Sequence, residues 1–305
     1  MSGGDDRSRP ILLVGTTGQV GAALATRLTT LGEVVGVGRS HADFERPEEL
    51  RALVRRVQPR IVVNAAAYTA VDAAEGDQQR CQRVNAEAPG VLAAEAERIG
   101  AMIVHFSTNY VFDGAAPGPY AEGEVTSPIN VYGVTKALGE RAVVEANPMH
   151  LIFRTAGVYG WSGRNFMLRI LALAREEEEL HVVDDQFVAP TPAIMVADAA
   201  VALLALEIAA ERGSGLFGTY HLTSSGSTSW FGFAERILAL TQSGAKSGGT
   251  RIRAVSSERF PAAARRPRNG VLNTDKLTRL LGVALPDWET ALRATLAERA
   301  NRSRE

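Results

Sequence analysis

Cysteine and long apolar runs are both scarce in this chain. Cys81 is the only cysteine, so no disulfide can form within the chain. No apolar run approaches the roughly 20 residues that span a bilayer, and residues 1–10 are too polar for a secretory signal. We therefore expect a reducing, cytoplasmic setting without a membrane partner.

An excess of charge of one sign is also missing. The chain has 33 basic and 34 acidic residues, which gives a formal net charge of -1. Proteins that bind nucleic acid usually carry a clustered basic excess. The balance therefore argues against a nucleic-acid partner and favours a small-molecule ligand.

Lysine is rare, and one of the few lysines has an informative neighbour. Only Lys136, Lys246 and Lys276 are present, and Lys136 stands four residues after Tyr132. This spacing places both side chains on one face of a helix. A compact ammonium favours the ionised form of a phenol, whose usual pKa is about 10, and it can turn its donors toward ribose hydroxyls. The pair is typical of a tyrosine that exchanges a proton with substrate, although a chance pair on one helix face is the alternative.

The first half of the chain alternates short apolar runs with amphipathic stretches. The runs predict buried strands at Ile11–Val14, Glu33–Val37, Ile61–Asn64, Met102–Phe106 and Leu151–Phe153. The stretches predict helices at Val20–Leu31, Pro47–Val57, Ala86–Ile99 and Val131–Ala146. Alternating strands and helices predict an α/β fold with a Rossmann-type, doubly wound parallel sheet.

This alternation ends after Tyr159. We predict a dinucleotide-binding Rossmann domain in residues 1–155 and mainly a smaller C-terminal substrate lobe in 156–305, with 193–223 returning to the Rossmann core. A long Ala/Leu-rich helix is expected around Val196–Glu211, and Ser243–Gly249 is expected to be a mobile loop. The lobe should close over the carboxyl edge of the sheet, where open α/β sheets bind ligands.

A glycine-rich turn directly follows the first predicted strand. Gly15, Gly18 and Gly21 allow a tight turn and a close approach to a pyrophosphate at the start of a helix. With Gln19 and Val20, they form the predicted dinucleotide-binding turn. An ordinary strand-to-helix turn also favours glycine and is the alternative.

The end of the second strand bears on which dinucleotide binds. An acidic residue there usually binds the ribose 2′-hydroxyl of NADH, but this chain has Arg39 and Ser40. Arg39 suits a 2′-phosphate, which favours NADPH and leaves NADH as the alternative. Asp43 and Phe44 are candidates for flanking the adenine.

Further candidates follow the third and fourth strands. Ala67, Tyr68 and Thr69 come after the third strand and are expected to line the nicotinamide end of the cofactor. Thr108 ends the fourth strand, where its hydroxyl could bind a substrate carbonyl. Tyr132 would then donate the proton, and Lys136 would hold the nicotinamide ribose and ease ionisation of the phenol. This set predicts carbonyl reduction by hydride transfer.

Several longer segments resemble the dTDP-4-dehydrorhamnose reductases, nucleotide-sugar 4-ketoreductases of the extended short-chain dehydrogenase/reductase superfamily. They include GTTGQVG (15–21), VNAAAYTAVDAAE (63–75), STNYVFDG (107–114), PYAEGEVTSPINVYGVTKALGE (119–140), RTAGVYG (154–160) and VVDDQFVAPTPA (182–193). The resemblance implies reduction, with NADPH, of a 4-keto-6-deoxy sugar carried on dTDP. It also implies a sugar pocket that includes Thr108, Asn109, Tyr110, Val71 and Gly157. A homodimer is a further expectation.

Two positions depart from the family pattern. Asn109 stands where the family usually has aspartate, and Gly157 stands where it usually has tryptophan. The exchanges remove a charge-assisted acceptor and a large apolar wall. They predict a related 4-keto-6-deoxyhexose with altered ring substitution, as in antibiotic sugars.

Some members of the family hold a metal at a dimer contact through glutamates. Glu289 remains at one of these positions, but Ala23 and Ile194 stand at two others, so no metal is expected. Cys81 and the five histidines show no ligand spacing and are expected to have packing or surface roles. The histidines are His41, His105, His150, His181 and His221.

Two other functions stay open. An epimerase or dehydratase of the same superfamily also uses a Tyr-xxx-Lys pair, but Arg39 and the segment at 185–191 argue against it. A non-catalytic, NADP-binding regulatory subunit is the second alternative. The presence of Thr108, Tyr132 and Lys136 argues against that function.

Overall fold

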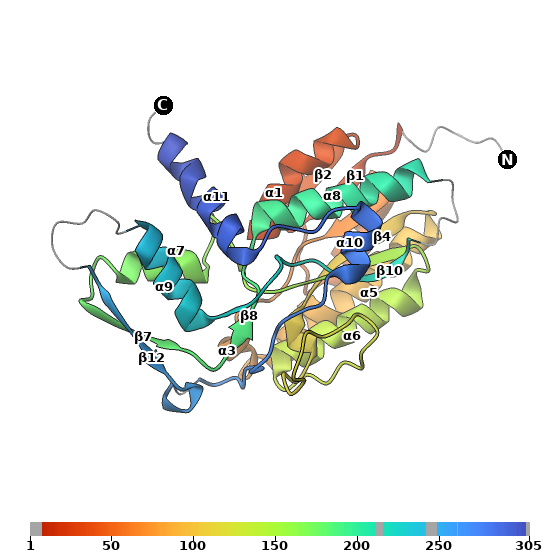
Figure 1. Cartoon of the computed structure of the whole chain (residues 1–305). Helices are drawn as coiled ribbons and strands as arrows, with labels where there is room; N and C mark the ends of the chain where they lie inside the picture. Colours follow the sequence, from red (N-terminus) through yellow and green to blue (C-terminus); the bar gives the residue numbers. More distant parts are fainter. Residues whose placement is uncertain (1–7, 211–215, 242–248, 261, 303–305) are drawn as a thin grey trace.

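A parallel sheet forms the centre of the protein, which we describe from a computed structural model (Figure 1). The structure describes residues 8–210, 216–241, 249–260 and 262–302. Within these residues, six strands form the sheet in the order β10-β5-β4-β3-β1-β2. Their bounds are β1 (Ile11–Val14), β2 (Val34–Val37), β3 (Ile61–Asn64), β4 (Met102–Thr108), β5 (His150–Thr155) and β10 (Gly218–His221). All neighbouring pairs are parallel, which confirms the predicted fold class.

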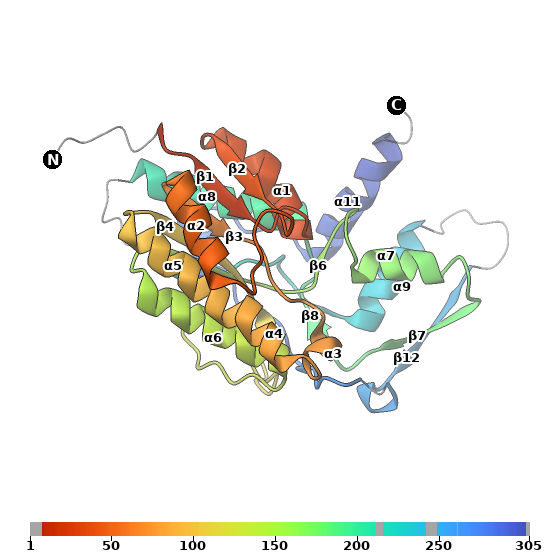
Figure 2. The same cartoon turned by 180° about the vertical axis from the view of Figure 1, so that it is seen from behind.

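Helices cover both faces of the sheet (Figures 1 and 2). One face carries α1 (Gln19–Arg27) and α8 (Ala193–Ala209), and the other carries α2 (Pro47–Val57), α5 (Ala88–Arg98) and α6 (Val131–Ala146). The short helices α3 (Val71–Ala74) and α4 (Gln78–Gln82) precede a π-helical segment, η3 (Arg83–Glu87). The 3₁₀ turn η2 (Leu28–Thr30) extends α1, and η4 (Asn109–Val111) follows β4.

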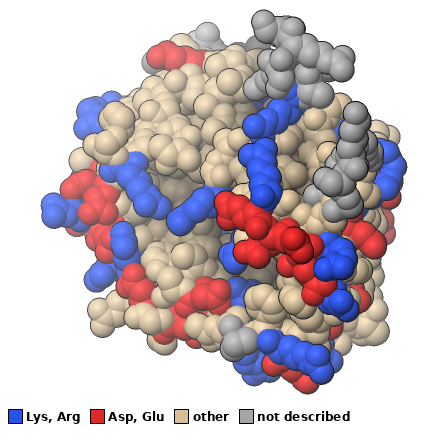
Figure 3. All heavy atoms as spheres, turned by 90° about the vertical axis from the view of Figure 1, so that its left-hand side faces the viewer, with Lys and Arg blue, Asp and Glu red and all other residues tan. Residues whose placement is uncertain are grey.

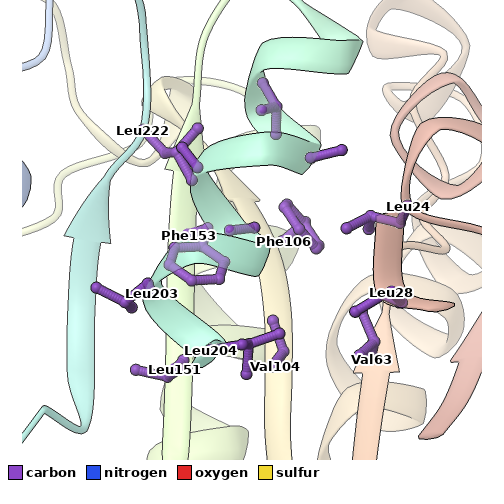
Figure 4. Close-up of a cluster of buried hydrophobic side chains, with 14 of the residues drawn as sticks. Leu24, Leu28, Val63, Val104, Phe106, Leu151, Phe153, Leu203, Leu204 and Leu222 are labelled. Carbon is purple, nitrogen blue, oxygen red and sulfur yellow. The ribbon is translucent and has the colours of Figure 1, made fainter. Parts of the chain in front are cut away.

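The strands divide their side chains between two cores because successive residues of a strand point to opposite faces. Val104, Leu151 and Phe153 pack toward α1 and α8 with Leu24 and Leu203 (Figure 4). On the other face, residues from α2 and α5 pack on alternate positions of the same strands, including Leu50, Leu92, Ile103 and Ile152. Burial on both faces explains why the strands are continuous apolar runs in the sequence.

Three strands differ in length from the sequence prediction. β4 and β5 extend to Thr108 and Thr155 because these two residues continue the ladder as partners. β2 begins at Val34, one residue after the predicted start. The extension of β4 places the Thr108 hydroxyl at the carboxyl edge of the sheet.

The part of the chain after β5 contributes one more helix that packs on the sheet and one more strand that joins it. α8 lies along α1, and β10 pairs with β5 over residues Gly218–His221. The proposed domain boundaries stay a prediction. Most of the expected loop at Ser243–Gly249 lies outside the described residues.

A smaller lobe lies beside the carboxyl edge of the sheet (Figures 1 and 2). It contains β6 (Val158–Tyr159), α7 (Phe166–Leu173), β7 (Glu179–Val183), β8 (Phe187–Val188), β9 (Thr191–Pro192), β11 (Thr228–Ser229), α9 (Trp230–Thr241), β12 (Arg251–Val255), η5 (Ser257–Arg259) and α11 (Trp288–Arg302). Its core centres on Tyr159, Met167 and Phe233, with Trp230 and Trp288 packed against them.

The chain then returns from this lobe to the first domain. The backbone of Tyr120 exchanges hydrogen bonds with Val271 and Asn273, and α10 (Asp275–Leu281) lies next to β10. The face in Figure 3 carries basic and acidic side chains side by side rather than a continuous patch of one sign. Among the described helices, none is both long and apolar enough to cross a membrane.

Candidate active site

The turn after β1 packs closely against the loop that follows β3. Gly15 has a φ of +90°, and a Cβ there would lie 2.5 Å from the backbone nitrogen of Ala66. A Cβ on Gly21 would overlap the carbonyl oxygen of Gly15. β1 lies between β2 and β3, so the turn sits where the strand order reverses. The backbone here fits a dinucleotide pyrophosphate at the start of α1.

The same turn contacts the smaller lobe. Gly18 is the N-cap of α1, and Val20 packs against the core beneath it. Gln19 Oε1 accepts a hydrogen bond of 3.0 Å from Asn165 Nδ2. Asn165 also caps α7 through the backbone N–H of Leu168. The sequence analysis missed Asn165, although asparagine before an apolar helical segment is a typical N-cap signal.

The candidates beyond β2 divide into exposed and engaged side chains. Arg39 and Ser40 are exposed just after the strand. Asp43 forms a local turn, in which its carboxylate accepts from the backbone of Glu45 at 2.9 Å. Phe44 is partly buried against the core beneath α2. Arg39, Ser40 and Asp43 are thus all exposed to a ligand, and Phe44 is the least accessible of the four.

The loop Ala67–Thr69 is held in place by Asn85. The Asn85 amide accepts from the backbone N–H of Tyr68 at 2.8 Å and donates to its carbonyl at 3.1 Å. Asn85 lies in the π-helical segment η3, a geometry often found at functional sites. A Cβ on Gly139 of α6 would overlap the Asn85 carbonyl, so this close approach requires glycine.

Cys81 belongs to the same cluster. Its thiol is buried, lies 3.2 Å from Thr135 Oγ1 and accepts from Asn85 Nδ2 at 3.4 Å. Cys81 stands in a polar stretch of the sequence, yet its thiol faces inward, toward Thr135 of α6. Val71 begins α3 and is half-buried, and Thr69 is exposed.

Thr108 and Tyr132 meet at the carboxyl edge of the sheet. Thr108 ends β4, where its Oγ1 accepts from the backbone N–H of Tyr110 at 3.2 Å. Tyr132 lies in the first turn of α6, with its phenol near the Thr108 hydroxyl. The Tyr110 ring packs edge-on against that of Tyr132, with 5.6 Å between centroids.

Burial raises the pKa of Tyr132 to about 12, although the nearby Thr108 side chain acts in the opposite direction. The phenol is therefore protonated at neutral pH and can act as an acid. The sequence suggested that a nearby ammonium would favour ionisation. In the structure, burial is the largest effect and favours the neutral phenol.

Lys136 lies one helical turn beyond Tyr132 and is fully buried. Its Nζ donates to the Phe106 carbonyl at 2.6 Å and lies 3.1 Å from His105 Nε2. Burial lowers the pKa of Lys136 to about 8, while Glu140 and Cys81 act in the opposite direction. The amine can therefore gain or lose a proton near neutral pH.

Asn109 is turned toward the chain segment that returns from the smaller lobe. Its Nδ2 donates to the Gly270 carbonyl at 3.1 Å, and its Oδ1 accepts from Thr108 Oγ1 at 3.3 Å. The Asn109 side chain is 5% exposed. A Cβ at Gly270 would overlap the Asn109 amide nitrogen. Asn109 thus links Thr108 to the returning segment.

Gly157 lies near a tryptophan from another element. Its φ is +55°, a conformation that favours glycine, and a Cβ there would lie 3.2 Å from Val188 Cγ2 and 3.5 Å from the Trp230 ring. The indole of Trp230 therefore lies beside the position where the family's tryptophan was expected. Apolar surface is still present at this place, but it comes from α9.

The returning segment 264–273 contacts residues of the candidate site, and these contacts were not predicted from the sequence. Arg266 pairs with Asp72 at 2.6 Å, and Asp72 also accepts from the Ala264 backbone at 3.1 Å. Asn130 caps α6 through the N–H of Gly133, while its Nδ2 donates to the Arg265 carbonyl at 2.7 Å. The N-cap at Asn130 could be recognised from sequence, but its contact with a distant segment could not.

The described residues contain no group of three or more His, Cys, Asp or Glu side chains that could hold a metal ion. Glu289 pairs instead with two arginines, Arg236 at 2.5 Å and Arg293 at 2.9 Å.

Tyr132 lies near a threonine hydroxyl, and the buried Lys136 lies one helical turn away. Together with the glycine-rich turn after β1, this arrangement is typical of short-chain dehydrogenases/reductases. The protein is thus a dinucleotide-dependent oxidoreductase of this class. Within the class, the chain belongs to the family described as RmlD substrate binding domain, whose model matches residues 9–301. This confirms the resemblance seen in the sequence.

Relatives and solved structures agree with this placement. A dTDP-4-dehydrorhamnose reductase from Burkholderia thailandensis is 47% identical over 287 residues, which cover 92% of this chain and 96% of that protein. The dTDP-4-dehydrorhamnose reductase structure from Clostridium acetobutylicum has a TM-score of 0.87 and 32% identity, and covers 95% of this chain and 99% of that one. The Bacillus anthracis structure, in complex with NADP, has a TM-score of 0.86 and 31% identity with the same coverage.

Proposed function

We propose that the protein uses NADPH to reduce the 4-keto group of a dTDP-linked 4-keto-6-deoxyhexose. The observation that carries this proposal is the phenol of Tyr132, which lies in the first turn of α6 near Thr108, with Lys136 one helical turn away. A reductase needs an acid at this place because the ketone oxygen becomes negative as hydride arrives. The relatives named dTDP-4-dehydrorhamnose reductases support the choice of sugar nucleotide.

Each residue has a defined part in this reaction. When bound, NADPH would supply hydride to C4 of the sugar. Thr108 would hydrogen-bond the ketone oxygen, and Tyr132 would give that oxygen the phenolic proton, so that a secondary alcohol forms. Lys136 would hold the ribose and ease ionisation of the phenol as it gives up its proton.

Arg39 supports NADPH rather than NADH. Its side chain is exposed at the end of β2, where a guanidinium can bind a 2′-phosphate with two parallel hydrogen bonds. The structural relative from Bacillus anthracis was solved with NADP. NADH remains the alternative cofactor.

Asn109 and Gly157 support a finer substrate assignment, to a sugar with altered ring substitution. The Asn109 amide is engaged with Gly270 and Thr108, which leaves it less able than a carboxylate to accept from a sugar hydroxyl. At Gly157 the apolar surface comes from the Trp230 ring of α9, whose nearest atom would lie 3.5 Å from a Cβ there, and not from a side chain at position 157. Both differences favour a substrate such as a 2-deoxy or amino sugar.

The decisive experiment measures NADPH oxidation with a panel of dTDP-4-keto-6-deoxy sugars and determines the C4 configuration of each product by NMR. We expect stoichiometric NADPH consumption and formation of the 4-hydroxy sugar. Turnover without net NADPH consumption would instead indicate an epimerase or dehydratase. NADPH binding without any turnover would indicate a regulatory subunit. A clear preference for dTDP-4-dehydrorhamnose over the 2-deoxy and amino analogues would overturn the altered-ring assignment alone.

A homodimer is a separate part of the proposal. Exposed apolar side chains on α6 support it, namely Val134, Leu138 and Val144. Light scattering of the purified protein gives the mass, and a monomer at micromolar concentration would contradict this part.

A further inference from the structure

A buried imidazole lies directly beside the Lys136 amine, and the reaction outlined above does not use it. His105 is in the middle of β4 and has no exposed surface. Its Nε2 is 3.1 Å from Lys136 Nζ, and its Nδ1 is 3.1 Å from Asn64 Nδ2. Burial, together with the nearby Lys136 ammonium, holds the pKa of His105 well below its usual range, so the ring is neutral.

The charges around the amine come from several elements. Glu140, one turn further along α6, favours the charged amine, but its carboxylate is held by Arg154 of β5 at 2.7 and 2.9 Å. The Cys81 thiol of α4 has the same effect, and the Tyr132 phenol is neutral. The two groups that the amine meets directly, the Phe106 carbonyl and His105, are both uncharged.

We propose that His105 is a positioning residue that acts through Lys136, fixing the direction of the amine while leaving it free to exchange its proton. The assignment rests on the proposed function, in which Lys136 supports Tyr132. Two donors of the ammonium are directed at β4, which leaves the third for the ribose. A carboxylate in place of the imidazole would hold the proton on the amine, and an apolar side chain would leave the buried ammonium without one of its partners.

The imidazole has a tautomer for each protonation state of the amine. When Lys136 is charged, Nε2 accepts and the ring proton is on Nδ1, so Asn64 must present its oxygen. When Lys136 is neutral, Nε2 can donate to Nζ, and Nδ1 can accept from Asn64 Nδ2, which lies 3.1 Å from it. In this second state Asn64 Oδ1 accepts from the Ala66 backbone at 3.1 Å. The protonation of Lys136 is thereby linked to the loop that packs on Gly15.

The scarcity of lysine makes a direct test practical. Protein labelled with ¹³C and ¹⁵N in lysine gives side-chain signals from only Lys136, Lys246 and Lys276, and the Lys136→Met variant assigns the signal of interest. We expect the titration midpoint of the Lys136 amine, read from its NMR signal, to lie near pH 8 in the native chain. His105→Leu and His105→Met remove the acceptor and should lower the midpoint by about one pH unit, a tenfold change in the proton affinity of the amine.

Two further variants separate positioning from folding. His105→Gln can present either an oxygen or an N–H to the amine and should restore the midpoint to within a few tenths of the native value. His150→Leu removes a partly buried histidine that contacts the Asn147 carbonyl instead, and should leave the Lys136 midpoint unchanged. An unchanged midpoint in both apolar His105 variants, or an equal shift in His105→Gln, would overturn the proposal.

The pH dependence of turnover gives a second readout. The alkaline limb of kcat/KM should move to lower pH in His105→Leu by the same amount as the Lys136 midpoint, and His105→Gln should restore it. If the alkaline limb of kcat/KM stays in place while the titration midpoint of Lys136 moves, the link between His105 and catalysis is overturned. If the native protein reduces none of the sugars, the proposed function fails, while the NMR titration still decides whether His105 controls the Lys136 amine.

Discussion

Replacing Asn109 with aspartate changes an amide into a carboxylate of almost the same size. In the native chain, Asn109 Nδ2 donates to the Gly270 carbonyl at 3.1 Å, and Oδ1 accepts from Thr108 at 3.3 Å. An ionised aspartate would keep the second interaction and turn the first into a contact between two acceptors. Asn109 is 5% exposed, so water cannot easily replace the lost donor.

The expected cost follows from these contacts. A buried carbonyl that loses its donor costs about 1–3 kcal/mol, and the repulsion and desolvation of the new charge add to it. We therefore expect Asn109→Asp to lower the free energy of unfolding by about 2–4 kcal/mol at pH 7. For a chain of this length, that corresponds to a fall in Tm of roughly 3–6 °C.

The same reasoning fixes the sign of the pH dependence. Burial beside a carbonyl should raise the pKa of the new carboxyl in the folded state above its unfolded value of about 3.9. The protonated carboxyl can again donate to Gly270. The stability deficit should therefore be smallest below about pH 4 and should grow as the pH rises through the folded-state pKa.

Thermal unfolding at several pH values measures this deficit, with Asn147→Asp as a matched control. Asn147 is also a buried asparagine, and its Nδ2 donates to the Ala101 carbonyl at 3.0 Å, away from Thr108. Both variants should lose stability, but only Asn109→Asp should also lower kcat/KM. If Asn109→Asp keeps the native stability at pH 7, the bond to Gly270 contributes nothing and the amide is available to the sugar.

Three other predictions test the cofactor and catalytic residues. Tyr132→Phe should lower kcat by about 10²–10⁴-fold and leave the Kd for NADPH, measured by fluorescence, within about twofold; full turnover would remove Tyr132 from the role of proton donor. Gly15→Ala should raise the Kd for NADPH at least about tenfold, because its Cβ would lie 2.5 Å from the Ala66 nitrogen, whereas Gly123→Ala, in open space, should leave it unchanged. An equal effect of both substitutions would contradict this role of the glycine-rich turn. Arg39→Asp should shift the ratio of kcat/KM values from NADPH toward NADH, and an unaltered ratio would place the 2′-phosphate elsewhere.

Much of the fold could be predicted because its signals are local. Each central strand is buried on both faces and is therefore a short apolar run, and the turn at Gly15 combines a positive φ with a close backbone approach. The Tyr132–Lys136 spacing is equally local, since one helical turn separates them. The ends of β4 and β5 were less predictable, because they depend on Thr108 pairing with Thr155.

The sequence by itself determined the α/β class and the family, and it predicted which residues would face a dinucleotide and a ketone. Only the tertiary structure decided what lies behind these residues. His105 meets Lys136 across 31 positions, and Asn109 meets Gly270 across 161. Such pairs depend on how whole elements pack, so no spacing in the sequence indicates them. Burial in the folded chain also sets the pKa of Tyr132 to about 12 and that of Lys136 to about 8, because it removes water from a phenol and an amine that would otherwise titrate as in solution.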